Sequence, residues 1–119
     1  MTTRVVDDRE TALRVGYEAT DWATPVTFEN YCAGLKDWSI STIERDGNPI
    51  GAAYKKNDEL HFSILPLWRK KWFTKNLMKT FLLSGRVTTK ISPGHDYMYG
   101  ILKRLGFSES ADGMLVKEN

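Results

Sequence analysis

The sequence has one cysteine and no long apolar run among its 119 residues. Cys32 alone cannot form an intramolecular disulfide, and the two histidines, His61 and His95, lie too far apart for zinc-ligand spacing. No membrane span is expected, because a span needs about 18 consecutive apolar residues. The N-terminus lacks the apolar core of a signal peptide. A thiol that stays reduced suits the cytoplasm, of a host cell if the protein is phage-encoded, or the inside of a virion.

Acidic residues are absent from residues 60–95, which carry seven basic ones, a local charge of +7. Residues 1–59 carry 7 basic and 11 acidic residues, a local charge of −4, although the whole chain is only +2. We therefore expect one electropositive and one acidic edge. With 119 residues, 41% of them hydrophobic, the chain fits a single packed domain spanning 1–119.

Apolar periodicity and turn residues predict an α/β (α+β mixed sheet) domain with helices on both faces. The predicted order is β-αα-βββ-α-β-α-ββ. Its parts are a strand at 4–6, a helix at 8–19 with Leu13, Tyr17 and Val15 inward, a helix from Thr27 to Gly34, strands at 39–46, 49–56 and 60–66, a helix at 67–83, a strand at 86–92, a helix at 95–105 ended by Gly106, and a C-terminal hairpin around Asp112-Gly113.

The stretch PLWRKKWFTKNLMK (66–79) places a basic helix directly after a strand. Lys71, Lys75 and Lys79 recur every four residues and form a basic stripe. Such a stripe can bind a phosphate, a nucleic acid or an acidic protein surface, or simply face the solvent. Trp68 and Trp72 alternate with these cations, as in nucleic-acid-binding surfaces, but their spacing suits a buried face equally well.

Three stretches in this order resemble the GCN5-related N-acetyltransferase (GNAT) family. They are DGNPIGAAY (46–54), LHFSILPLWRKKWFTKNLMKTFL (60–82) and ISPGHDYMYGILKRLGF (91–107), whose ending is similar to the family's Tyr-x-x-Leu-Gly-Phe. The resemblance implies the GNAT (acyl-CoA N-acyltransferase) fold and an acetyl-CoA site. The cofactor-binding positions it implies are Ile64, Leu65, Arg69, Lys70, Lys71, Trp72, Thr74 and His95.

The phosphate-binding turn departs from the family pattern. GNAT enzymes hold the pyrophosphate on Arg/Gln-x-x-Gly-x-Gly/Ala, where glycines let backbone N–H groups approach the phosphates. Arg69 matches the first position, but Trp72 and Thr74 replace the two glycines. By this resemblance Trp72 lies at the mouth of the cofactor slot, so an exposed indole there would be a candidate for partner contact together with Lys71, Lys75 and Lys79.

The last helix departs as well. An Asn that typically contacts the cofactor matches His95, and the Tyr that often protonates the departing thiolate matches Leu102, which carries no proton to give. Tyr99 lies three residues earlier and could replace it as the acid. No carboxylate occurs within 60–65 as a general base, although Glu59 precedes this strand.

The small GNAT-like internal virion proteins of short-tailed phages share several of these features. They are similar in size, in a Trp-Arg opening to a very basic helix and in a Leu-Lys-x-x-Gly helix ending; here these are Trp68-Arg69 and Leu102 to Gly106. This likeness implies a phage protein that acts by protein binding, self-association or assembly, in the virion or on the host.

Three functions are therefore open from the sequence. The first, which we favour, is a GNAT-fold protein with a degenerate acetyl-CoA turn that acts mainly by binding. The second is an acetyl-CoA-dependent N-acetyltransferase, in which Arg69, Lys70 and Lys71 hold the phosphates by charge and Tyr99 is the acid. The third is a nucleic-acid-binding module that uses the lysine stripe.

Overall fold

Seven strands form one mixed sheet in the order β1-β2-β3-β4-β5-β7-β6. The computed structural model describes residues 3–20, 24–69, 72, 77, 86–90, 96–110 and 113–118. The strands are β1 (Thr3–Val6), β2 (Ser39–Arg45), β3 (Asn48–Lys56), β4 (Glu59–Ile64), β5 (Arg86–Thr89), β6 (Ser108–Glu109) and β7 (Leu115–Glu118). All pairings are antiparallel except that of β4 with β5. The predicted α+β mixed sheet is confirmed.

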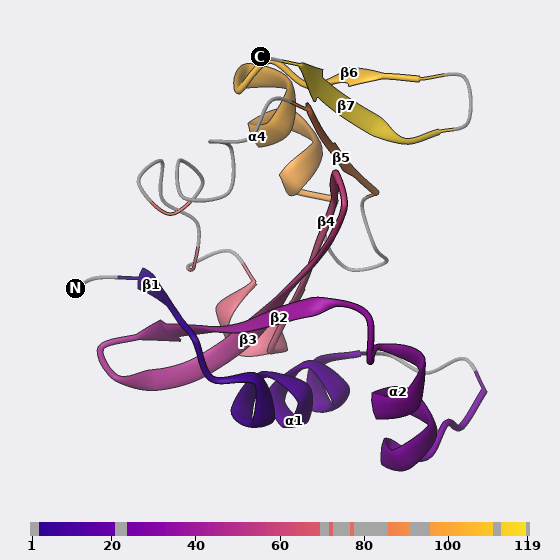
Figure 1. Ribbon diagram of the computed structural model, residues 1–119. Coiled ribbons are helices and arrows are strands. Elements are labelled where there is room, and N and C mark those ends of the chain that lie inside the picture. The colour runs from indigo at the N-terminus through magenta and orange to yellow at the C-terminus, as the bar shows by residue number, and fades with distance from the viewer. Residues whose placement is uncertain are drawn as a thin grey trace.

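The described α-helices are α1 (Arg9–Ala19), α2 (Phe28–Gly34) and α4 (Met98–Arg104). Helices α1 and α2 lie together beside β2 and β3, whereas α4 lies at the other end of the molecule beside β5 and β7 (Figure 1). The helix predicted at 67–83 falls mostly outside the described residues; its start is a 3-10 turn, Pro66–Trp68, and Leu77 is helical. No helix in the described part of the chain is long and apolar enough to cross a membrane.

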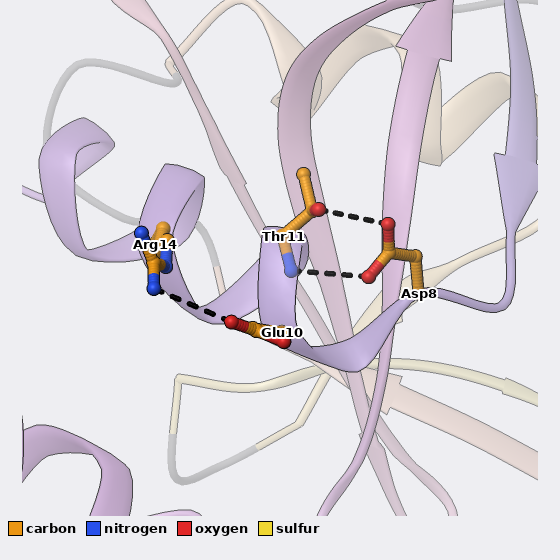
Figure 2. A network of polar contacts seen from close by, with 4 residues as sticks. All are labelled: Asp8, Glu10, Thr11 and Arg14. Atoms are coloured by element: carbon orange, nitrogen blue, oxygen red, sulfur yellow. Dashed lines mark hydrogen bonds and ion pairs between the residues drawn. The ribbon is translucent and has the colours of Figure 1, made fainter.

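Local capping explains where the helices begin and end. The Asp8 carboxylate accepts hydrogen bonds from the backbone N–H and the hydroxyl of Thr11, which begins α1 (Figure 2). These bonds, the hydroxyl's first, hold the pKa of Asp8 below its usual value. One turn later Glu10 pairs with Arg14 on the exposed side of α1 (Figure 2). At the end of α4, Gly106 adopts φ +101°, and the next N–H donates back to Leu102, which closes the helix.

The strongest turn signal also formed as predicted. Asp46 and Gly47 have φ values of 52° and 82°, the left-handed conformation that a tight hairpin between β2 and β3 requires. The hairpin register pairs Arg45 with Asn48. This hairpin fixes β3 beside β4, the strand on which the candidate site depends.

Side-chain alternation along β4 separates two apolar cores. Leu60, Phe62 and Ile64 face a larger core that also contains Trp72 and residues of β5, β7 and α4. His61 and Ser63 face the other side, where α1 and α2 cover a smaller core. The prediction that His61 points away from Leu60 and Phe62 is therefore confirmed.

The inward residues of α1 differ from those predicted. Ala12, Gly16 and Ala19 are fully buried, whereas Leu13, Val15 and Tyr17 are only partly buried. The reason is close packing of α1 on the sheet. A Cβ at Gly16 would lie 1.8 Å from the hydroxyl of Tyr54 and 2.7 Å from that of Tyr31.

We predict that Gly16→Ala destabilises the protein by about 1–3 kcal/mol, because the rigid, buried tyrosines cannot yield the space that a methyl group needs. Gly100→Ala is the matched control in α4, where an added Cβ meets nothing within 4 Å. It should raise the free energy of unfolding by up to about 1 kcal/mol, since alanine favours helix. Urea denaturation measures both. Equal effects of the two substitutions would contradict the close approach at Gly16.

Candidate functional site

Strands β4 and β5 are paired at only one end. In the described part of the sheet their ladder contains a single residue pair, Glu59 with Thr88, next to the bond from the Thr88 N–H to the Asp58 carbonyl at 2.6 Å. Toward their carboxyl ends no further pair connects the described residues of the two strands. This divergence lies where the family resemblance places the gap for the pantetheine arm.

The indole of Trp72 is packed at this divergence. Its exposed fraction is 0%, and it belongs to the core that includes Ile64 of β4 and Val87 of β5. Its ring centroid lies 5.0 Å from that of Phe62, and its Nε1–H donates to the Tyr97 hydroxyl at 2.7 Å. Trp72 therefore links β4 to the residue preceding α4. It does not meet the condition under which we expected a partner contact, an exposed indole.

Arg69 binds backbone carbonyls rather than projecting into solvent. Its Nε donates to the Ile64 carbonyl at 3.1 Å, and its Nη2 donates to the Ala19 carbonyl at 3.0 Å. Ala19 ends α1, and a cation at a helix C-terminus is favoured by the helix dipole. The guanidinium that the resemblance assigns to a pyrophosphate thus joins the end of β4 to the end of α1.

The end of β4 is also engaged within the chain. The side chain of Ile64 is fully buried, and its carbonyl accepts the bond from Arg69. The N–H of Leu65 donates to the Ile50 carbonyl at 2.9 Å. Both residues that we expected to contact a cofactor therefore have internal hydrogen bonds in this structure.

Two tyrosines near the start of α4 point to different places. The Tyr99 hydroxyl donates to Glu109 of β6, its ring lies 5.0 Å from the Lys103 Nζ, and it is 40% exposed. Tyr97 instead meets Trp72 at the strand divergence. Burial raises the pKa of Tyr97, while the Trp72 hydrogen bond and the charge of Arg69 act in the opposite direction. Of the two, Tyr97 has its hydroxyl beside the predicted slot.

Leu102, the residue at the family's acid position, is buried in the larger core. The remaining predicted site residues lie outside the described part of the chain: Lys70, Lys71, Thr74, Lys75, Lys79 and His95. Their roles in cofactor, partner or nucleic-acid binding stay predictions. Trp72 is buried, so its indole is not available to stack on a base in this structure.

A pocket of about 440 Å³ opens on the other face of β4, beside α2. Its volume is within the range of small-molecule sites, about 300–1,000 Å³. Glu59, His61 and Ser63 contribute the β4 wall, because alternate residues of a strand share one face. Glu59 is the first residue of β4 rather than a residue preceding it, and its Oε2 lies 3.2 Å from the His61 Nε2.

Two tyrosine hydroxyls form the polar base of this pocket. The hydroxyls of Tyr31 and Tyr54 lie 2.7 Å apart, and both residues line the pocket. Burial raises the pKa of Tyr31 far above its ordinary value, and the neighbouring Tyr54 adds to the effect. Burial also raises the pKa of Tyr54, partly offset by hydrogen bonds with Ser63 and Tyr31. Both groups therefore stay protonated under ordinary conditions.

Sequence reasoning missed Tyr97, Tyr31 and Tyr54 as site residues and treated Glu59 as flanking. The alternation of Glu59, His61 and Ser63 was a usable signal for a shared face. The hydroxyl pair had no comparable signal, because Tyr31 and Tyr54 come from different elements.

Comparisons with known proteins place the fold. No family model matches the chain, and no curated protein matches its sequence. Solved structures match almost its whole length. An N-acetyltransferase from Staphylococcus aureus has 11% identity over 99% of both chains and a TM-score of 0.71. A GCN5-related N-acetyltransferase from Rhodopseudomonas palustris has 13% identity over 99% of this chain and 95% of its own, at a TM-score of 0.66.

A third similar structure contains a ligand. It is the PaiA N-acetyltransferase from Thermoplasma acidophilum in complex with coenzyme A, with 13% identity over 100% of both chains and a TM-score of 0.61. Identities this low show the fold and nothing finer. The chain therefore has the GNAT fold.

The buried tyrosines predict a loss of stability in alkali. An unfolded tyrosine loses its proton near about pH 10, whereas the raised pKa values of Tyr31 and Tyr54 keep the folded state protonated. Above this pH the unfolded state binds fewer protons, so the free energy of unfolding should fall by up to about 1.4 kcal/mol per pH unit for each such group. Below about pH 9 these groups should have no effect.

Urea unfolding of the wild type, Tyr31→Phe and Tyr99→Phe between about pH 8 and pH 11 tests this. Tyr31→Phe should show a shallower alkaline fall than the wild type, because one titrating group is gone. Tyr99→Phe, which removes an exposed hydroxyl, should keep the wild-type slope. A Tyr31→Phe slope equal to that of the wild type would refute the assignment.

Proposed function

We propose that this protein acts by binding rather than by acetyl transfer, because Trp72 occupies the space that a pantetheine arm would need. The observation that carries the proposal is the buried indole between Phe62 and Tyr97, where β4 and β5 diverge. The engagement of Arg69 and of the Leu65 N–H within the chain supports it.

A working N-acetyltransferase is the second candidate. The observation that favours it is Tyr97, whose hydroxyl lies at the slot with the charge of Arg69 nearby. In that case Trp72 would have to move, acetyl-CoA would take its place, and Tyr97 rather than Tyr99 would be the tyrosine positioned to protonate the departing thiolate. The pocket beside Glu59 and His61 would then receive the acceptor amine.

Isothermal titration calorimetry with acetyl-CoA separates the two candidates. We expect no saturable binding in the micromolar range for the wild type, because the slot is filled and its turn lacks glycines. Saturable micromolar binding that Arg69→Ala abolishes and Arg14→Ala leaves intact would overturn our proposal in favour of the enzyme. Arg14 is the matched control because its guanidinium lies on the exposed side of α1, paired only with Glu10 among the described contacts.

We further propose that binding includes self-association, as in the assembly role of a phage-type protein in a virion or host cytoplasm. Leu67, at the entrance to the basic stretch, is 84% exposed, the largest exposure among the large apolar residues described. The chain is acidic in residues 1–59 and basic in residues 60–95, so one copy can present the charge that another lacks.

Sedimentation velocity tests this association. The weight-average mass of the wild type should rise with concentration and fall when salt is added, because charge attraction between copies is screened. Leu67→Ser should weaken the association, whereas Tyr99→Ser, at the 40% exposed tyrosine of α4, should not. A monomer at every concentration in low salt would rule the interface out.

A further inference from the structure

The pocket beside α2 is separate from the space that Trp72 fills. Its β4 wall consists of Glu59, His61 and Ser63, whereas Leu60, Phe62 and Ile64 face the core around Trp72. The two sites therefore share the backbone of β4 but not its side chains. A ligand in the pocket does not need the cofactor slot to be open.

The charge of the pocket is negative. Glu59 is its only carboxylate, and no lysine or arginine occurs among the described residues that line it. The His61 ring lies within hydrogen-bonding distance of one carboxylate oxygen. A carboxylate accepts hydrogen bonds through both oxygens, so Glu59 can also accept from a ligand donor.

Aromatic rings supply most of the remaining wall. Tyr31, Trp38 and Tyr54 line the pocket, and the rings of Trp38 and His61 lie 5.7 Å apart. The Nζ of Lys56 lies 5.9 Å from the centroid of the Trp38 ring, so this indole already attracts one ammonium group. Lys56 is a tethered cation at the edge of the site rather than a part of its lining.

We propose that this pocket binds a small organic cation, an amine with an apolar or aromatic body. The ammonium group lies against Trp38 and donates to Glu59, and the apolar body lies against Val26 and Leu35. The protonated hydroxyls of Tyr31 and Tyr54 form a neutral polar base that does not repel a cation. An anion would meet Glu59 without a compensating lining cation.

Three test ligands of the same shape and different charge examine the proposal: 2-phenylethylammonium, 2-phenylethanol and 3-phenylpropanoate. Titrations followed by nitrogen-15 NMR give a dissociation constant for each and locate the site through the indole N–H signal of Trp38. The ammonium should bind with saturation, the alcohol about three- to fivefold more weakly, as a partly exposed ion pair allows, and the anion most weakly.

Two carboxylate variants make a matched pair. Glu59→Gln should weaken the ammonium about three- to fivefold and leave the alcohol unchanged, because only the charge is lost. Glu10→Gln removes the same charge from the exposed side of α1 and should change neither ligand. An equal affinity of ammonium and alcohol in the wild type, or no effect of Glu59→Gln, overturns the proposal.

A gain of affinity distinguishes binding from folding defects. Lys56→Met removes the tethered ammonium from the Trp38 ring, so the soluble ammonium should bind more tightly to this variant. A damaged fold cannot produce this result. Unchanged or weaker binding by Lys56→Met, or signal changes confined to residues outside the pocket, also overturns the proposal. None of these outcomes depends on acetyl-CoA, so cation binding and the filled cofactor slot can fail separately.

Discussion

The buried indole of Trp72 is the contact on which the structure around the diverging strands depends. It packs on Phe62 of β4 and donates to Tyr97 before α4, so it holds together elements that no ladder joins there. Truncating a buried tryptophan costs about 3–5 kcal/mol. A ligand arm that expelled the indole would have to offset a similar cost, about two to four orders of magnitude in affinity. The indole is therefore a barrier to cofactor binding as well as a core residue.

Local signals in the sequence were sufficient for the fold. The Asp46-Gly47 turn fixed a hairpin because its backbone needs positive φ values, and Asp8 and Gly106 set helix ends through their own hydrogen bonds. Alternation along β4 placed His61 and Phe62 on opposite faces. These features depend on neighbours within a few residues, which is why the order of elements followed from the sequence and agreed with the GNAT resemblance.

The site depends on contacts between distant residues, and there the sequence was less informative. Helical spacing made Tyr99 a candidate acid, yet its hydroxyl meets Glu109, and Tyr97 reaches the slot instead. The charge of Arg69 suggested a phosphate ligand, but 50 residues separate it from Ala19, whose carbonyl it binds. A basic residue at a turn has the same local pattern whether its partner is a ligand or a helix end, so only the tertiary structure distinguishes them.

The alternation of β4 explains how one function can be lost while another remains. One set of its side chains packs with Trp72 in a closed core, and the other set lines an open pocket. Filling the first space changes neither the residues nor the charge of the second. In a GNAT fold with a filled slot, ligand recognition on the opposite face therefore need not depend on acetyl transfer. A pocket with a carboxylate and aromatic walls is then better explained as a binding site in its own right than as half of a lost active site.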